Sequence, residues 1–278
     1  MKYRHQYHAG NFADVHKHVC LLEVLGALTR KDKGLLFVDT HAGRGDYDLH
    51  PGDAQHPAEW QAGAARVLAA QPRHTALTTY RDMIAAGVHG AALRYPGSPL
   101  LAMRMLRAVD RAVFFETQRD EAGHLRKTLE GAARTRIEVG DGFAGLRGLL
   151  PPPERRGCVL IDPPYEERAD YARLQEAAVD ALQRFPTGVL VAWLPVKLRA
   201  DFDLWFGGFD RALARPLLAS LLWLHTPDSR AALNGSALVI VNPPYLLEQA
   251  MREWLPELRA LLGDARSGSE VLVTSGHR

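Results

Sequence analysis

The sequence predicts an α/β protein built on a largely parallel sheet. Two observations carry this prediction. Apolar runs of strand length recur along the chain, and several of them, such as 35–39, 112–116 and 158–162, end in an acidic residue. Stretches with helical periodicity separate these runs, an alternation typical of parallel strands joined by helices. Because ligands bind where parallel strands end, the acids predict one site along one edge of the sheet.

Composition narrows the class of protein. Of the 278 residues, 47% are hydrophobic and 24% are charged, as in a soluble globular chain with a large core. No apolar run approaches the roughly 20 residues that span a membrane, and the chain starts without the apolar stretch of a signal peptide. Cys20 and Cys158 form no metal or disulfide motif, so we expect a cytoplasmic protein. The net charge of +2 permits a nucleic-acid partner through a local basic patch without indicating one.

The first predicted strand leads into a glycine-rich turn. The strand covers 35–39 and ends at Asp39, and Gly43 and Gly45 follow it closely. Glycines at such a turn let the backbone approach a ligand closely. The turn therefore predicts a site for a nucleotide-type cofactor. The absence of a Walker lysine argues against a nucleoside triphosphate.

Helical segments flank this strand on both sides. Apolar spacing predicts a helix over 11–30, in which composition alone makes Lys17 a solvated charge and His18 a partly buried imidazole. A mostly helical insertion is expected over 46–95, between the first and second core strands. The main domain then comprises 1–45 and 96–278. Ser98 lies at the start of a further helix, where it could face a ligand beside the glycine turn.

Later strands supply the other acids. The second strand, 112–116, ends at Glu116, and an acid there holds ribose hydroxyls in nucleoside-binding α/β folds. A third strand with its turn covers 136–142 and carries Asp141, and a fourth covers 158–162. Three more are expected, which gives seven strands in all: 187–194, 217–224 and 237–241.

The fourth strand breaks at Asp162-Pro163-Pro164-Tyr165, here called the Asp162 tetrapeptide. A carboxylate, two rigid prolines and an aromatic face at a strand end can grip a flat ring that bears an amine. A near copy, Asn242-Pro243-Pro244-Tyr245, follows the last predicted strand and is called the Asn242 tetrapeptide. Either sequence is compatible with an enzyme that acts on an amino group. The cofactor turn and the other acids follow strands one to three, so the site belongs with strand four, and we assign the Asn242 tetrapeptide a structural role.

Taken together, the glycine turn, Glu116, Asp141 and the Asp162 tetrapeptide resemble S-adenosylmethionine-dependent methyltransferases of the seven-stranded, Rossmann-like class I that act on exocyclic amines. The last strand of that class is antiparallel, which the end of this chain can supply. The exocyclic nitrogen of adenine is a poor nucleophile because its lone pair is delocalised into the ring. Asp162 and the Pro163 carbonyl can accept hydrogen bonds from the amine and favour a tetrahedral nitrogen. Tyr165 can stack on a flipped-out base, a contact worth about 1–3 kcal/mol.

Longer motifs narrow the resemblance to the bacterial 23S rRNA (adenine(2030)-N6)-methyltransferase family. The blocks that carry it are Tyr3-Arg4-His5, His8-Ala9-Gly10-Asn11, Ala13-Asp14-Val15, Lys17-His18, Asp39-Thr40-His41-Ala42-Gly43, Tyr95-Pro96-Gly97-Ser98-Pro99, Asp141-Gly142-Phe143, Arg156-Gly157 and Ile161-Asp162-Pro163-Pro164-Tyr165-Glu166. The match runs over essentially the whole chain. The departures are Arg44 in the glycine turn and Tyr245, while 46–95 matches poorly.

The resemblance implies S-adenosylmethionine as cofactor and 23S rRNA as partner, with Asp162 as the catalytic residue and a helical subdomain at 46–95. The implied cofactor pocket contains His18, His41, Ser98, Glu116, Asp141 and Gly142, with Lys17 close by; the glycine turn adds Gly43. The substrate side combines the Asp162 tetrapeptide with Tyr3 as an RNA contact, and Arg4 is expected to bind phosphate in a salt-sensitive way. We expect no metal, because neither a cysteine nor an acid completes a ligand set with the N-terminal histidines.

Three other functions stay open on the sequence. A DNA adenine-N6 methyltransferase shares the Asp162 tetrapeptide chemistry but usually has a target-recognition domain, and none is evident. A protein-glutamine methyltransferase would use the Asn242 spelling, which strand position disfavours. A non-catalytic RNA-binding protein on the same scaffold would have no need to retain Asp162 and the glycine turn. Nothing in the sequence demands an oligomer or an obligate protein partner, so we expect a monomer.

Overall fold

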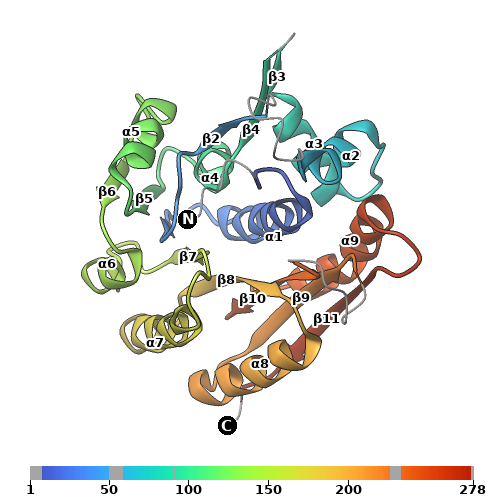
Figure 1. The fold of residues 1–278 in the computed structure, drawn as a ribbon. Helices are drawn as coiled ribbons and strands as arrows, with labels where there is room; N and C mark the ends of the chain where they lie inside the picture. Colours follow the sequence, from blue (N-terminus) through green and yellow to red (C-terminus); the bar gives the residue numbers. More distant parts are fainter. Residues whose placement is uncertain (1–7, 50–58, 90–91, 226–232, 277–278) are drawn as a thin grey trace.

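The fold centres on one large sheet. The computed structural model describes residues 8–49, 59–89, 92–225 and 233–276, in which eight strands form a sheet of order β11-β9-β10-β8-β7-β1-β5-β6 (Figure 1). Their bounds are β1(Leu36–Asp39), β5(Arg111–Glu116), β6(Thr135–Val139), β7(Gly157–Ile161), β8(Val189–Val196), β9(Leu217–Trp223), β10(Gly235–Val241) and β11(Gly268–Thr274). Tyr3 and Arg4 lie outside the described residues.

Strand directions confirm an α/β protein with a mostly parallel sheet. The strands β6, β5, β1, β7 and β8 are parallel neighbours, whereas β10 is antiparallel to both β8 and β9. The prediction of seven strands is wrong, because β11 adds an eighth at the edge of the sheet, antiparallel to β9. Its side chains are only partly buried and include Ser269 and Glu270. The segment therefore lacks the continuous apolar run by which the inner strands can be predicted.

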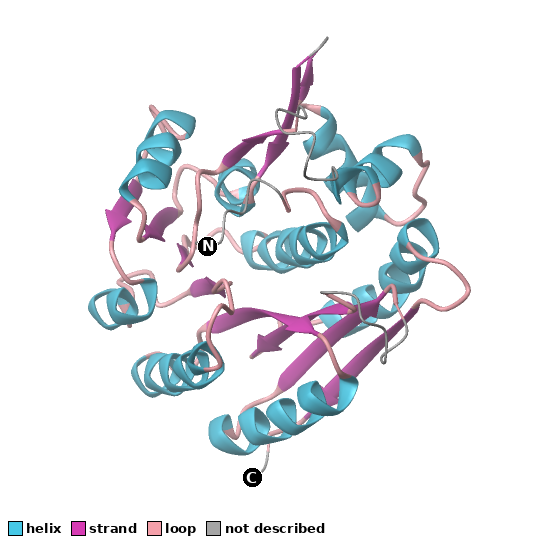
Figure 2. Ribbon diagram, viewed as in Figure 1, coloured by secondary structure: helices cyan, strands magenta, loops and turns pink. Residues whose placement is uncertain are grey.

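Helices cover both faces of the sheet, as Figure 2 shows. One face carries α6(Gly142–Leu149), α7(Ala169–Arg184) and α8(Arg199–Leu213), whose apolar side chains pack in a single cluster with the sheet. The other face carries α1(Phe12–Thr29), α4(Ser98–Met105), α5(Arg119–Thr128) and α9(Leu247–Leu262). Among the described helices, none combines the length and the apolar character needed to cross a membrane.

Helix α1 is buried on nearly all sides. Every residue from Ala13 to Leu22 is buried, including the charged and polar ones, because α1 lies between the sheet and the segment 46–95. The side chain of Asn11 caps its start by accepting hydrogen bonds from Ala13 N and Asp14 N, both at 3.0 Å. Polar side chains on α1 must therefore find partners inside the protein.

The segment 46–95 is less helical than predicted. It contains η2(Glu59–Gln61), α2(Ala64–Ala69) and α3(Thr75–Ala85), together with a small sheet of order β2-β4-β3. The strands of this sheet are β2(Asp46–Asp48), β3(Val88–His89) and β4(Ala92–Pro96). Buried side chains of α2 and α3 share one hydrophobic core with α1 and α9. A domain boundary around 46–95 stays a prediction.

Candidate active site

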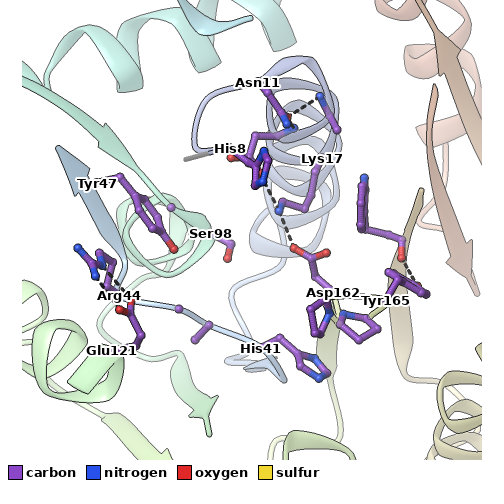
Figure 3. Close-up of a pocket in the computed structure, with 18 of the residues that line it drawn as sticks. His8, Asn11, Lys17, His41, Arg44, Tyr47, Ser98, Glu121, Asp162 and Tyr165 are labelled. Atoms are coloured by element: carbon purple, nitrogen blue, oxygen red, sulfur yellow. Dashed lines mark hydrogen bonds and ion pairs between the residues drawn. The ribbon is translucent and has the colours of Figure 1, made fainter. Parts of the chain in front are cut away.

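A pocket of about 620 Å³ lies where β1, β5, β7 and β8 end, with α1 along one side (Figure 3). This volume is within the range of small-molecule and cofactor sites. Most of the residues predicted from the sequence line it: Lys17, His18, His41, Gly43, Ser98, Glu116, Asp162, Pro163, Pro164 and Tyr165. The strand ends thus bring together side chains that are far apart in sequence.

The glycine turn is fixed to the end of β5. Gly43 has a φ of +62°, and its N–H donates to Glu116 Oε2 at 3.0 Å. A Cβ at this position would lie 2.4 Å from the hydroxyl of Tyr47, so only glycine fits. The other oxygen of Glu116 accepts a hydrogen bond from Gln118 N at 2.7 Å. Backbone N–H groups therefore hold the Glu116 carboxylate at the pocket wall.

A buried acid ties β1 to α4 behind the pocket. Asp39 has no exposed surface, and its oxygens accept hydrogen bonds from Ser98 Oγ at 2.7 Å and His41 N at 3.1 Å. Burial raises the pKa of Asp39 to about 6, against the effect of those two donors. The hydroxyl of Ser98, predicted to face a ligand, is thus also a structural link.

Lys17 reaches from α1 to the Asp162 tetrapeptide (Figure 3). Its Nζ lies 2.5 Å from Asp162 Oδ2 and 2.8 Å from Asp14 Oδ1, and the Lys17 side chain is only 6% exposed. Burial lowers the pKa of Lys17, but the two carboxylates outweigh it and hold the pKa well above its ordinary value. The interpretation of Lys17 as a solvated charge is therefore wrong.

Two histidines at the pocket have different surroundings. Burial lowers the pKa of His41 to about 4, so its imidazole is neutral at physiological pH. His18 Nδ1 is hydrogen-bonded to the hydroxyl of Tyr95 at 2.7 Å, and that hydroxyl lies 3.0 Å from the hydroxyl of Tyr80 on α3. This buried chain connects the pocket wall to the segment 46–95.

Comparison with known proteins identifies the family. Residues 32–273 match the family described as ribosomal RNA large subunit methyltransferase D, RlmJ. The chain belongs to this RlmJ family. It is 36% identical over 269 residues to the ribosomal RNA large subunit methyltransferase J of Escherichia coli K12, covering 96% of both chains. It is 35% identical over 271 residues to the protein of the same name from Haemophilus influenzae, covering 97% of this chain and 96% of that one.

A solved structure has the same fold over nearly the whole chain. A crystal structure of a Legionella pneumophila protein superposes with a TM-score of 0.86 at 32% identity, covering 97% of this chain and 98% of that one. The family predicted from the sequence motifs is confirmed, and this RlmJ-family chain is an rRNA methyltransferase.

Two residues expected at the cofactor lie outside the pocket lining of this RlmJ-family protein. Asp141 caps α6 by accepting a hydrogen bond from Phe143 N at 2.9 Å, and it pairs with Arg173 at 2.5 Å. Gly142 packs against the backbone of Thr40, since a Cβ there would lie 2.1 Å from the Thr40 carbonyl oxygen. Both residues have structural roles here, and their contact with a cofactor stays a prediction.

Sequence reasoning missed part of the pocket, most clearly Trp193 near the carboxyl end of β8. The Tyr165 hydroxyl donates a hydrogen bond to the Trp193 carbonyl, and the two ring centroids are 5.7 Å apart. The Lys17 ammonium lies 5.8 Å from the centre of the indole. An aromatic residue near the end of a predicted core strand was the available signal.

The Asn242 tetrapeptide lies on the side of the sheet opposite the pocket, near the amino ends of the parallel strands. Because β10 is antiparallel to β8, its last residue, Val241, pairs with Leu190 near the start of β8. Asn242 Nδ2 donates to the carbonyls of Pro186 and Gly188, both at 2.9 Å. These contacts support the structural role predicted for it. Within the described part of the chain, no group of three or more potential ligands could hold a metal ion.

Proposed function

We propose that this enzyme transfers a methyl group from S-adenosylmethionine to the exocyclic N6 of an adenine in 23S rRNA, the counterpart of adenine 2030. The single observation that carries the proposal is the position of the Asp162 tetrapeptide. It follows β7 directly and lines the same pocket as Gly43 and Glu116. Gly43 follows the neighbouring strand β1, and Glu116 is the last residue of β5. An amine-gripping acid therefore faces the residues suited to a nucleoside-type cofactor.

The donor set fits S-adenosylmethionine in a class I methyltransferase fold. Glu116 retains acceptor capacity for a ribose hydroxyl, because a carboxylate has about four lone-pair sites and three accept hydrogen bonds, from Gly43 N, Gln118 N and, at 3.4 Å, the Thr117 hydroxyl. His18, His41 and Ser98 would hold the rest of the cofactor, with Asp141 and Gly142 at the outer margin. When bound, the cofactor supplies an activated methyl group on a sulfonium. Catalysis by the protein is then mainly alignment and electrostatics.

Asp162 would hold the target amine. Lys17 Nζ contacts Oδ2 of Asp162 and leaves Oδ1 to accept a hydrogen bond from the amine, while the Pro163 carbonyl accepts the second. Two acceptors at these hydrogens favour a tetrahedral nitrogen with its lone pair directed out of the base plane. The proton lost on methylation passes to Asp162. The base must leave its stack to reach this pocket, and Tyr165 would stack on it.

The remaining parts of the proposal concern partners. Tyr3 and Arg4 would contact the RNA, with Arg4 binding phosphate, and the enzyme would act as a monomer in the cytoplasm. Phosphate contacts make affinity depend on salt, with a slope of about −0.7 per contact for single strands. Binding of 23S rRNA that does not weaken between 50 and 200 mM salt would contradict this part.

Labelled S-adenosylmethionine offered with unmodified 23S rRNA, duplex DNA and a release factor tests the function. We expect label in the rRNA alone, mapped to one adenine as N6-methyladenine. Asp162→Ala should lower the rate of transfer roughly 10³-fold and retain cofactor binding, measured by calorimetry. Label confined to DNA or protein would overturn the substrate, and an active Asp162→Ala enzyme would overturn the catalytic assignment.

A further inference from the structure

A buried histidine lies behind the aromatic wall of the pocket. His16 on α1 has no exposed surface, and its ring nitrogens lie between two serines that also have none. Nδ1 is 3.0 Å from Ser236 Oγ on β10, and Nε2 is 2.8 Å from Ser220 Oγ on β9. The same Ser236 Oγ accepts a hydrogen bond from Trp193 Nε1 at 3.0 Å. A continuous chain therefore runs from the pocket to the centre of the protein.

One placement of the protons satisfies every donor in this chain. An indole N–H can only donate, so Ser236 Oγ accepts from Trp193 and has its own proton available for His16 Nδ1. With Nδ1 as acceptor, the proton of a neutral imidazole is on Nε2, which donates to Ser220. Burial lowers the pKa of His16 to about 3, in agreement with a neutral ring. This assignment satisfies every donor from Trp193 to His16.

Burial alone does not require such a chain. Among the described residues, three other indoles, those of Trp60, Trp205 and Trp254, have a buried Nε1 without a hydrogen-bond partner. The fold therefore tolerates unsatisfied indole N–H groups. Trp193 differs from these three because it lines the pocket, where the orientation of its ring matters to whatever is bound.

The register explains how the chain reaches the pocket. Trp193, Leu238 and Ser220 lie in one row across β8, β10 and β9, and Ser236 is two residues from Leu238 on the same face. That face is the one on which α1 packs, so His16 meets both serines directly. The two serines lie in strands that are otherwise almost wholly apolar. Their hydroxyls serve this chain.

We propose that His16 and Ser236 are positioning residues that fix the indole of Trp193 as a second aromatic surface of the target-base site, beside Tyr165. This inference rests on the proposed function. The Trp193 and Tyr165 rings are inclined at 60°, so a planar base that lies flat on one ring presents an edge to the other. Two rings inclined in this way fix both the plane of a bound purine and its rotation within that plane. Both must be right for its exocyclic amine to reach Asp162.

Matched serine variants test the proposal. Ser236→Ala and Ser220→Ala each remove one buried hydroxyl from His16, but only Ser236→Ala frees Trp193. We expect kcat on 23S rRNA to fall about tenfold in Ser236→Ala, with the KM for S-adenosylmethionine unchanged, because the base is misaligned. Ser220→Ala should stay within about twofold of wild type, in the range of small positional effects. Equal losses in both variants would reduce the chain to a folding role and overturn the inference.

A double-mutant cycle gives a sharper outcome. Trp193→Phe retains an aromatic ring but lacks the N–H, so its kcat should fall by about as much as that of Ser236→Ala. The kcat of the double variant should be no lower than that of either single variant. Additive losses would contradict a shared function. The indole N–H signal of Trp193 in NMR spectra should lose protection from exchange in Ser236→Ala and keep it in Ser220→Ala, whatever the substrate. If wild type labels only DNA, the proposed function fails, and the same kinetic comparison on DNA still decides this inference.

Discussion

The Asp162 and Asn242 tetrapeptides differ in sequence only at their first residue, but they lie on opposite sides of the sheet. Asp162 lies at the carboxyl end of β7, 16% exposed, with its carboxylate on the buried ammonium of Lys17. Asn242 follows β10 at the other edge of the sheet, where its amide donates to two backbone carbonyls. Tyr165 packs against Trp193 in the pocket, while Tyr245 is 87% exposed.

The difference teaches that strand direction decides what such a motif can do. In both copies one residue has a positive φ, Tyr165 at 51° and Asn242 at 51°, so the backbone turns differently after each strand. Asparagine adopts this conformation more readily than most residues, which suits a structural turn. Methyl transfer requires the cofactor and the substrate to meet at the carboxyl ends of the parallel strands. Of the two tetrapeptides, only the one that follows β7 lies there.

The largest expected difference in rate is between substitutions of Asp162 and Asn242, the first residues of the two tetrapeptides. Asp162→Ala should lower the rate of rRNA methylation roughly 10³-fold, since the amine loses its acceptor. Asn242→Ala should leave the rate within about twofold, as expected for a site away from the pocket. Asn242→Asp in the Asp162→Ala background should restore nothing, although it recreates the active spelling. Recovered activity in that double variant, measured with labelled cofactor, would break the comparison.

Lys17 gives the next effect. Lys17→Met should lower the methylation rate about 10²-fold, because Asp162 loses the cation that positions it. This substitution removes the cation that the carboxylates of Asp14 and Asp162 share, at a cost of about 3–5 kcal/mol in the free energy of unfolding. Chemical denaturation and kinetics on the folded fraction separate the two losses. Lys17→Arg should recover part of the stability, and an unchanged rate in Lys17→Met would exclude any role beyond folding.

The two tyrosines should differ less. Tyr165→Ala should weaken kcat/KM for rRNA about tenfold, the lower part of the range for losing a base–aromatic stack. Tyr245→Ala, on an exposed side chain, should have no measurable effect on kcat/KM or stability. A comparable loss in Tyr245→Ala would show that the Asn242 edge also binds RNA, and filter binding would detect it.

Asn242 should matter for stability and not for the rate. Asn242→Ala leaves the carbonyls of Pro186 and Gly188 without their shared donor, at a cost of about 1–2 kcal/mol in the free energy of unfolding. The rate should stay near that of wild type at temperatures where the variant is folded. A variant as stable as wild type in urea titrations would remove the structural role assigned to Asn242.

The last effect is on the pH dependence of stability. The folded pKa of His41 is about 4, below its ordinary 6.5, so its contribution to stability is present above pH 6.5 and is lost as pH falls toward 4. Asp39, with a pKa raised to about 6, acts in the opposite direction between about pH 6 and 3.8. His41→Asn should therefore reduce the acid-induced loss of stability by about 1 kcal/mol per pH unit between pH 6.5 and 4.5. Asn242→Ala, which removes no ionisable group, should leave this slope unchanged.

The sequence was sufficient to predict the parallel core and most of the pocket lining, because the strands β1, β5 and β7 are apolar runs that end in an acid or are followed directly by one. Edge strand β11 escaped prediction because its side chains are only partly buried. Trp193 and the pairing of Lys17 with Asp162 were missed for another reason. They depend on which helix covers which strands, a tertiary fact with no local periodicity. Asp141 shows the converse, since its strand position is right and its carboxylate is engaged in a cap and an ion pair.

Three consecutive residues of α1 connect regions that are distant along the chain. His16 contacts serines 204 and 220 residues away, Lys17 contacts an acid 145 residues away, and His18 contacts a tyrosine 77 residues away. One turn of helix is thus a meeting point for β9, β10, the end of β7 and the segment 46–95. The pocket cannot be assembled before these regions dock on α1, nor can it loosen without releasing them. Catalytic competence should therefore be as cooperative as the fold, disappearing in a single transition with the global structure.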